Sequence, residues 1–348
     1  MRPPDGASIP HPIERTPMKP IKTFLLTGLI LCTASASATS LTVYTYDSFT
    51  SDWGPGPQVK QAFEAECGCE LKLVGLEDGV TLLNRLRIEG SNSEADIVLG
   101  LDTNLTAEAR DTGLFAEHGI GVKDFTLPQD WNDRHFLPYD YGYFAFVYNR
   151  ENLASVPASL RELVEDADGP SILIQDPRTS TPGLGLLLWM KKIFGDDAAD
   201  AWAKLQPRIV TVTKGWSEAY GMFLKNEAPM VLSYTTSPAY HAIAEEDTRF
   251  AAASFSDGHY MQIEVAGMLE SSDEPELARK FLEFMTGPVF QQIIPTTNWM
   301  YPAALAKDQL PTGFTGLVEP QSVHLFDERN VAQNRKAWVN EWLEAMSR

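Results

Sequence analysis

The sequence predicts an α/β protein of two lobes, and three observations support this. Segments typical of strands and helices alternate along most of the chain, which is the pattern of parallel strands joined by helices. The length of 348 residues is long for a single compact core and suits two domains. The chain also begins with a segment typical of secreted proteins. Together these features favour two α/β lobes that fold outside the cytoplasm.

Residues 1–38 are predicted to be a signal peptide. An apolar run from Phe24 to Leu31 follows two lysines and precedes Ala36-Ser37-Ala38, the small-x-small pattern of a cleavage site. The run is shorter than the roughly 20 apolar residues that a membrane span needs. We therefore expect cleavage after Ala38, with Met18 as an alternative start of the chain.

The composition excludes several classes of protein. Asp and Glu number 47 against 28 Lys and Arg, and a net charge of −19 argues against binding to nucleic acid or to an anionic membrane. A hydrophobic content of 44% is typical of a globular protein. With only three cysteines, the chain is not a disulfide scaffold.

Cys67 and Cys69 flank Gly68, which permits a tight turn. In an oxidising compartment we expect the two cysteines to form a disulfide. The alternative is two free thiols packed between a helix and a strand. No further cysteine or histidine stands close by, and the histidines of the chain are scattered, so no metal site is predicted.

The first part of the mature chain shows the order strand, helix, strand, helix, strand. Alternating β-branched and aromatic residues predict the first strand, and a proline at a first helical turn predicts the helix after it. Asp78 stands as the N-cap of the second helix, which has leucines on one face. The strands are expected at 41–46, 71–73 and 95–101, and the helices at 57–65 and after Asp78.

The alternation of strands and helices continues to the C-terminus. Strands are expected at 144–148, 171–175, 209–213, 230–234 and 260–268. Helices are expected at 184–194, 202–205, 216–224 and 275–285 and from about Glu328 onward, where Trp338, Trp342 and Met346 share a face and pack into the core. The first lobe is placed at 39–142 and 262–298, and the second lobe at 143–261 and 299–348.

Unusual residues follow the strands, at the edge where α/β sheets bind ligands. Six aromatic residues stand on these loops: Tyr46, Trp53, Trp216, Tyr234, Tyr240 and Trp299. Any one of them alone is more typical of a loop anchor. Together they favour a cleft for a flat heteroaromatic ring or a quaternary cation, with Asp78 and Glu218 adding negative charge.

The segment Thr179-Ser-Thr-Pro-Gly183 places hydroxyls at the start of a helix, which is a ready anion site. The alternative is simple N-capping by Ser180 or Thr181. The sequence has no phosphate-binding glycine motif, no nucleophile elbow and no metalloprotease motif, and we find no nucleophile paired with a base. No catalytic residue is therefore assigned, and a binding protein is favoured over an enzyme.

Several of these segments resemble the periplasmic thiamine-binding proteins of bacterial thiamine ABC importers. The similar segments are 41–49, 52–57, 69–73, 76–80, 175–190, 210–221, 232–241 and 298–302. The resemblance implies a type II periplasmic binding protein, in which two α/β lobes joined by a hinge enclose a ligand cleft. It also implies a periplasmic monomer that delivers its ligand to an ABC permease and, through the permease, to the ATPase.

The ligand implied by this resemblance is thiamine, thiamine monophosphate or thiamine diphosphate, carried as a transported ligand and not as a cofactor. The implied contacts are Asp78, Gly79, Ser180, Thr181, Trp216, Tyr234, Thr235, Thr236 and Ser237, surrounded by Tyr46, Trp53, Tyr240 and Trp299. Within this set we expect Tyr240 to stack on the pyrimidine, Trp216 beside Glu218 to attract the thiazolium, and Ser180 and Thr181 to hold the phosphate.

Two other functions of the same architecture are considered. A thiaminase-like enzyme needs a cysteine nucleophile in the cleft, but Cys67 and Cys69 precede a strand and are expected at its far end. A ferric-ion binding protein needs adjacent tyrosines, and the sequence contains no Tyr-Tyr pair. Both alternatives are disfavoured.

Overall fold

The computed structural model describes residues 39–121, 124–153 and 155–347. The predicted signal peptide, residues 1–38, lies outside these ranges. The described residues group as one unit, with strands and helices alternating along it. No described helix combines the length and the apolar character that crossing a membrane requires.

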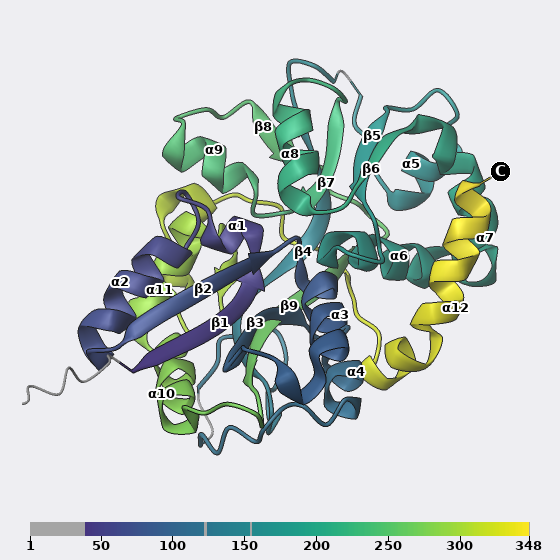
Figure 1. Cartoon of the computed structure of the whole chain (residues 1–348). Helices are drawn as coiled ribbons and strands as arrows, with labels where there is room; N and C mark the ends of the chain where they lie inside the picture. The colour runs from purple at the N-terminus through teal and green to yellow at the C-terminus, as the bar shows by residue number, and fades with distance from the viewer. Residues whose placement is uncertain (1–38, 122–123, 154, 348) are drawn as a thin grey trace, which may run out of the picture. The chain divides into compact units, whose positions relative to one another are not determined.

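The first lobe is built on a sheet with the strand order β2-β1-β3-β9-β4 (Figure 1). β1 pairs in parallel with both β2 and β3, so the carboxyl ends of these strands lie at one edge. β9 runs antiparallel to β3 and to β4. The strands span Ser40–Tyr46 (β1), Glu70–Leu76 (β2), Ile97–Asp102 (β3), Leu137–Asn149 (β4) and His259–Met268 (β9).

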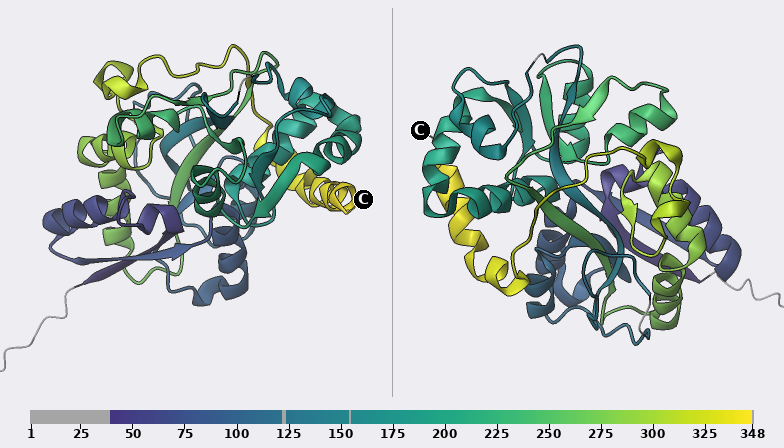
Figure 2. Two further views of the ribbon diagram at one scale, coloured as in Figure 1. Left: turned by 90° about the horizontal axis from the view of Figure 1, so that it is seen from above. Right: turned by 180° about the vertical axis from the view of Figure 1, so that it is seen from behind.

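The second lobe continues from the same long strand, in the order β4-β7-β5-β6. The half of β4 before Phe144 pairs with β9, and the half from Phe144 onward pairs with β7. β4 therefore runs through both lobes, as the views in Figure 2 also show. The remaining strands span Ile172–Gln175 (β5), Ile209–Thr213 (β6), Met230–Tyr234 (β7) and the short Phe250–Ala252 (β8), Tyr301–Pro302 (β10) and Val323–His324 (β11).

Helices cover both faces of each sheet because successive strand residues point to opposite faces. In the first lobe, Val43 of β1 packs with α2, α10 and α11, whereas the neighbouring Tyr44 packs with α3 and α4. These helices span Asp47–Thr50 (α1), Gly56–Cys67 (α2), Gly79–Glu89 (α3), Thr106–Asp111 (α4), Pro275–Met285 (α10) and Pro288–Thr297 (α11).

The second lobe packs α5, α6, α7 and α12 on one face of its sheet and α8 on the other. Its helices span Leu160–Glu165 (α5), Thr181–Phe194 (α6), Ala198–Leu205 (α7), Trp216–Leu224 (α8), Pro238–Ala244 (α9) and Glu328–Met346 (α12). Short 3-10 turns lie at Gly90–Asn92, Gly195–Asp197, Gln206–Arg208, Lys307–Gln309 and Thr312–Phe314.

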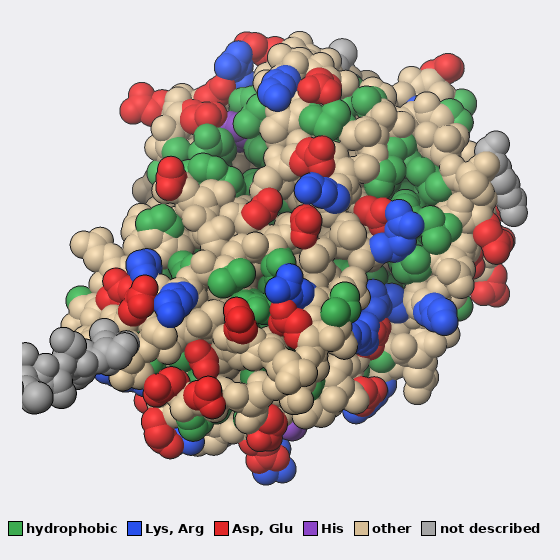
Figure 3. All heavy atoms as spheres, viewed as in Figure 1, with side chains coloured by type: hydrophobic (Ala, Val, Ile, Leu, Met, Phe, Trp, Pro, Cys, Tyr) green, Lys and Arg blue, Asp and Glu red, His purple; other side chains and the backbone are tan. Residues whose placement is uncertain are grey.

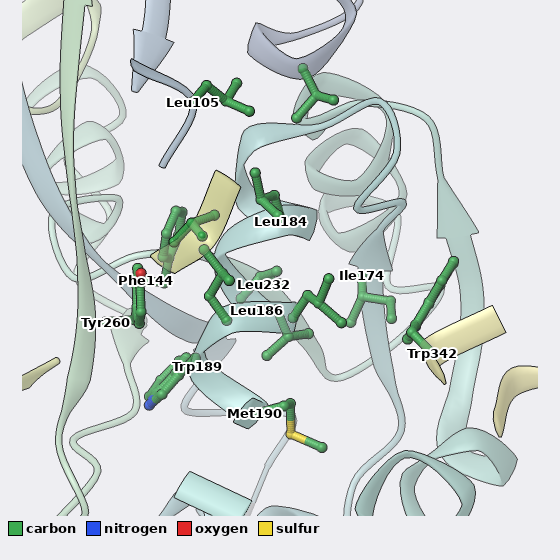
Figure 4. Close-up of a cluster of buried hydrophobic side chains, with 14 of the residues drawn as sticks. Leu105, Phe144, Ile174, Leu184, Leu186, Trp189, Met190, Leu232, Tyr260 and Trp342 are labelled. Atoms are coloured by element: carbon green, nitrogen blue, oxygen red, sulfur yellow. The ribbon is translucent and has the colours of Figure 1, made fainter. Parts of the chain in front are cut away.

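The largest apolar core surrounds α6, whose residues from Thr181 to Met190 are all buried. Figure 4 shows leucines of this helix beside Phe144 of β4, Tyr260 of β9 and Trp342 of α12. α6 approaches β4 so closely that a Cβ atom at Gly185 would overlap the ring of Phe144. This helix thus has its position fixed, and its N-terminus with it.

The structure corrects the prediction of parallel sheets. β4 and β9 run antiparallel to their neighbours, so both sheets are mixed. β4 also begins at Leu137, seven residues before the predicted strand at 144–148, because the tyrosines, Pro138 and Asp140 in this stretch hid its strand character. Pro138 is accommodated at an irregularity in the pairing with β9.

The chain contacts both lobes around the predicted boundary at residue 299. β10 pairs with Asp140 and Tyr141 of β4, on the side of the first lobe. Trp299, just before β10, lies against Tyr240 of α9. The lobe boundaries stay predictions.

Candidate functional site

A cavity of about 310 Å³ lies where the two sheets meet, at the carboxyl ends of β1, β2 and β7. This volume is in the range of small-molecule sites. Its lining comes from both lobes: Tyr46, Asp47, Ser48, Trp53, Glu77, Asp78, Glu264, Thr297, Asn298, Trp299 and Met300, and Pro182, Trp216, Ser217, Tyr220, Gly221, Leu224, Tyr234, Ser237 and Tyr240. Seven of these residues are aromatic and four are acidic, whereas no Lys, Arg or His belongs to the described lining.

Eight of the residues predicted from the sequence meet in this cavity. They are Tyr46, Trp53, Asp78, Trp216, Tyr234, Ser237, Tyr240 and Trp299. Most of them lie at strand ends or in the loop or first helical turn that follows, whereas Trp299 follows α11. These segments are far apart in the sequence. The other predicted residues, Gly79, Ser180, Thr181, Thr235 and Thr236, are not in the lining.

Trp216, the first residue of α8, is held from behind by a column of rings. Its ring stacks on Tyr220, with centroids 4.8 Å apart, and Tyr220 stacks on His241, which stacks on Phe250. The indole N–H donates to Ser233 Oγ at 2.8 Å. These contacts fix the orientation of the indole before any ligand arrives.

Trp53 faces Trp216 from the first lobe, with ring centroids 6.3 Å apart. Its side chain is 52% exposed, which is unusual for so large an apolar group. Trp53 sits on the loop between α1 and α2. A ligand between the two indoles would cover this exposed face.

Tyr240 and Trp299 form a second aromatic pair, with centroids 5.4 Å apart and rings at 71°. The Tyr240 hydroxyl donates to Glu245 Oε1 at 2.8 Å. Trp299 has a backbone φ of +58°, a left-handed conformation that is rare for a bulky residue. Strained backbone of this kind gathers at functional sites.

Asp78 occupies the position where the sequence predicted an external anion. It caps α3 by accepting from the Gly79 N–H at 2.8 Å, and it accepts from Ser180 Oγ, the N-cap of α6, at 2.7 Å. The carboxylate of Asp78 thus lies at the N-termini of two helices. Burial nevertheless raises the pKa of Asp78 to about 6.

Four other predicted contacts are buried in supporting positions. A Cβ atom at Gly79 would overlap Thr181 Oγ1, so glycine allows α3 and α6 to approach each other. Thr181, Thr235 and Thr236 are at most 1% exposed. The Thr235 N–H donates to the carbonyl of Tyr143 in β4, which anchors the loop after β7. Any role of these residues as direct ligand contacts stays a prediction.

Glu264 and Asn298 are cavity residues that the sequence analysis missed. Glu264 lies in β9, is 6% exposed, and accepts hydrogen bonds from the hydroxyls of Tyr46 and Tyr139. Asn298 is the C-cap of α11 and donates to the Tyr46 hydroxyl and to Asp140. The sequence did offer one signal for Glu264: a glutamate stands between Ile263 and Val265 in a strand that is apolar enough to be buried. A buried acidic residue of this kind is a candidate for a functional site.

Asp47 and Glu77 add acidic groups on the first-lobe side of the cavity. Asp47 accepts from Ser217 Oγ of the second lobe at 3.0 Å, and Glu77 lies 3.8 Å from Lys214 Nζ. Glu218, which was expected to act beside Trp216, is not in the lining. The negative charge of the cavity therefore comes mainly from the first lobe. The outer face in Figure 3, in contrast, shows acidic and basic side chains interspersed.

The cysteines lie away from this cavity. Cys67 ends α2 and Cys69 precedes β2, whereas the cavity is at the opposite end of β2, beside Glu77. A disulfide joins the two cysteines across Gly68. The described residues include no group of three or more acidic, cysteine or histidine side chains suited to a metal ion.

Comparison with known proteins decides the family. Residues 55–292 match the family model of the bacterial extracellular solute-binding proteins. The chain belongs to this family. The chain is a solute-binding protein and not an enzyme, and the relatives described next place it in the periplasm.

Relatives of this solute-binding protein carry a more specific name. The chain is 60% identical to a thiamine-binding periplasmic protein of Escherichia coli strain K12, over 92% of this chain and 98% of the relative. It is 56% identical to a thiamine-binding periplasmic protein of Brucella melitensis, over 94% and 98%. A solved structure of a periplasmic thiamin binding protein matches with a TM-score of 0.88 at 59% identity, covering 90% of this chain and 98% of that one.

Proposed function

We propose that this solute-binding protein captures thiamine in the cavity between its lobes. The observation that carries the proposal is the lining itself, which combines aromatic and acidic side chains without a basic residue among those described. Thiamine is a flat aminopyrimidine joined to a thiazolium with a permanent positive charge. Aromatic faces and carboxylates attract such a cation, and each cation–π contact contributes about 0.5–2 kcal/mol.

The similarity to proteins named for thiamine binding supports the same ligand. At 60% identity over nearly the whole length, the two chains share their fold and much of their local structure. Fold alone does not define a ligand, so the proposal rests on the cavity as well.

Thiamine monophosphate and diphosphate are included in the proposal. Their phosphate needs N–H and hydroxyl donors, and the N-terminus of α6 already holds the Asp78 carboxylate. The start of α8 is the alternative, because its N-cap, Gly215, provides no side-chain acceptor for the first-turn N–H groups. Ser217 in this turn lines the cavity, and its hydroxyl, which donates to Asp47, would turn to the phosphate when the ligand binds. We therefore place the phosphate beside Ser217 and assign Ser180 to holding Asp78.

Delivery to an ABC import permease completes the proposed function. Polar contacts join the lobes beside the cavity, including Ser180 to Asp78 and Ser217 to Asp47. A ligand that touches both lobes adds to these contacts and favours the closed arrangement. A monomer that closes in this way presents a changed surface to the permease.

Calorimetric titration of the mature protein tests the proposal. Thiamine and its two phosphates should each bind with one ligand per chain, and choline, a quaternary cation without an aromatic ring, should bind far more weakly. Binding of choline as tight as that of thiamine would mean that the cavity selects charge alone. No heat with any of the three thiamine forms, confirmed by an unchanged melting temperature, would refute the proposal.

A further inference from the structure

A second pocket, of about 450 Å³, lies where α12 of the second lobe meets α3 and α4 of the first lobe (Figure 1). None of the described residues that line it belongs to the lining of the cavity between the lobes. The charged residues of its lining are Arg87 of α3, Glu108 of α4, Arg178 from the loop before α6, and Arg335 and Lys336 of α12. The molecule therefore has a second, separate hollow with a charged lining.

The charge of this pocket is opposite in sign to that of the chain. Four basic residues and one acidic residue give its described lining a net charge of +3, whereas the whole chain carries −19. The cavity between the lobes has four acidic residues and, among those described, no basic one. Figure 3 shows a group of basic side chains on this face, between α3 and α12. Charge of one sign in a concave site attracts ligands of the other sign, so this pocket suits an anion.

The arginines of the pocket are held in place by carboxylates. Glu108 accepts from Arg87 Nη2 at 2.6 Å and from Nε and Nη2 of Arg335 at 2.6 Å and 2.8 Å. Arg178 Nε donates to Asp176 Oδ1 at 2.9 Å. A guanidinium has five N–H donors, so each arginine keeps donors that these carboxylates do not use. The guanidinium groups are thus oriented in advance and can still bind a further oxyanion.

Lys336 adds a charge that is not offset by a carboxylate among the described residues. It forms no ion pair with them, and the residue is exposed at the edge of the pocket. When Asp176, the partner of Arg178, is counted with the lining, the pocket still keeps a net charge of +2. An anion with two or more negative charges would balance this charge.

We propose that this pocket binds one small multivalent anion of the phosphate class. Arginine suits such a ligand because its planar fork of N–H groups matches two oxygens of a tetrahedral oxyanion. Arg87 binds the anion from the first lobe, Arg178 and Arg335 bind it from the second lobe, and Lys336 contributes a point charge. The inference does not rest on the proposed function, because the pocket and the cavity share no described residue.

The bound anion connects α3 of the first lobe to α12 of the second lobe. Because a ligand that binds only the folded chain stabilises it, inorganic pyrophosphate should raise the melting temperature of the protein in a concentration-dependent way. Sodium chloride is adjusted to keep the ionic strength constant, so that general screening of charges does not contribute. A melting temperature that does not respond to pyrophosphate under these conditions would contradict the inference.

Calorimetric titration of the mature protein with inorganic pyrophosphate tests the site directly. The titration is made on the unliganded protein and on protein saturated with thiamine, which occupies the cavity under the proposed function. We expect one pyrophosphate per chain in both states, and weaker binding of orthophosphate. Pyrophosphate binding that thiamine abolishes would place the anion in the cavity and overturn the inference. Failure of thiamine to bind would refute the proposed function alone, since the titration of the unliganded protein still measures the anion.

Lys336 gives the sharpest variants, because its substitution breaks no ion pair among the described residues. Lys336→Gln should weaken pyrophosphate binding about threefold, and Lys336→Glu about tenfold, as expected for loss and reversal of one exposed charge. Lys225→Glu is the matched control, since Lys225 is the exposed C-cap of α8, on the other face of the second-lobe sheet. It should keep the affinity of the wild type. Equal affinities of the wild type and Lys336→Glu, or an equal loss in Lys225→Glu, would show that the anion binds elsewhere.

The same phosphate chemistry occurs in free anions and in lipid headgroups, and sedimentation with vesicles distinguishes the two sources. The inference expects pyrophosphate binding without sedimentation on phosphatidylglycerol vesicles, because the net charge of −19 opposes approach to an anionic surface. Sedimentation that Lys336→Glu abolishes, in a protein that does not bind pyrophosphate, would assign the pocket to a lipid headgroup and overturn the small-anion site.

Discussion

The cavity presents two kinds of side chain to a ligand, aromatic rings and carboxyl groups. The rings of Trp216 and Tyr240 are each held by further aromatic contacts, so they offer fixed flat faces. The carboxyl of Asp78 is held by the N-termini of α3 and α6. Such fixed groups lose little freedom when a ligand binds, which favours affinity.

Substitutions of Tyr240 test whether its ring contacts the ligand. Tyr240→Phe removes only the hydrogen bond to Glu245, so thiamine affinity should stay close to that of the wild type. Tyr240→Leu removes the π face and should weaken binding by about 0.5–2 kcal/mol with little change in stability. Calorimetry and thermal melts of the unliganded variants measure both effects. A much lower melting temperature with unchanged affinity would show that Tyr240 contributes only to the packing of the core.

Ser180→Ala and Ser217→Ala distinguish support of the cavity from phosphate recognition. Ser180→Ala frees Asp78 from its hydrogen bond, so all three thiamine forms should bind more weakly by a similar factor. Ser217→Ala should weaken the two phosphates more than thiamine, by about tenfold. Calorimetric affinities for the three ligands give the comparison. A selective loss of the phosphates in Ser180→Ala would instead restore the phosphate site predicted from the sequence.

The sequence predicted most aromatic residues of the cavity because loop aromatics after strands are conspicuous. It could not predict that Ser180 would be used by Asp78, because that contact joins residues 102 positions apart. It also missed Glu264, because a strand interior is where an apolar residue is expected. The chemistry of the site was therefore predictable, but the pairing of its polar groups required the fold.

Elements of secondary structure place these residues through close packing. α6 is fixed by its contact with β4, and the glycines of α6 and α8 differ in the space around them. A Cβ atom at Gly185 would overlap Phe144, whereas one at Gly221 would meet no atom within 4 Å.

These two glycines give a matched pair of alanine substitutions. Gly185→Ala should destabilise the protein by about 1–3 kcal/mol through overpacking. Gly221→Ala should stabilise it by about 0.5–1 kcal/mol, because alanine has the higher helix propensity. Urea unfolding of the unliganded proteins measures both changes. Equal effects of the two substitutions would mean that α6 moves away from β4 at little cost, contrary to the close packing described above.

Elements with regular patterns were predicted closely: β6, β7, α8 and α10 have the expected bounds. α11 was not predicted, because Pro288 and the internal Pro295 are typical of a loop. The first half of β4 was missed because its tyrosines, Pro138 and Asp140 interrupt the apolar pattern, although Tyr139 and Tyr141 are buried in apolar clusters. The short elements α4, α5 and β8 were not predicted either, because each is too short to show a clear period.

At the scale of the whole molecule, the buried carboxyl groups link stability to pH. Burial raises the pKa of Asp78 to about 6 and that of Asp102 to about 7, from ordinary values of 3.8. The folded protein therefore holds more protons than the unfolded chain between about pH 4 and pH 7. This contribution to stability is complete below the unfolded pKa and is lost as the pH rises through the folded values.

The melting temperature of the unliganded protein should accordingly fall between pH 5 and pH 8. Each group lowers the free energy of unfolding by up to about 1.4 kcal/mol per pH unit in this window. Asp102→Asn should flatten the decline, because it removes one of the titrating groups. Calorimetric melts across this range are the measurement, and a melting temperature that rises steadily with pH would contradict the assignment.

The central claim is that thiamine binds between the lobes, among the aromatic and acidic side chains of the cavity. A crystal structure of the mature protein grown with thiamine tests it most directly. We predict one thiamine per chain, its rings among Trp216, Tyr240 and Trp299 and its thiazolium near Glu264. Thiamine bound outside this cavity, or a cavity that stays empty at saturating thiamine, would contradict the account.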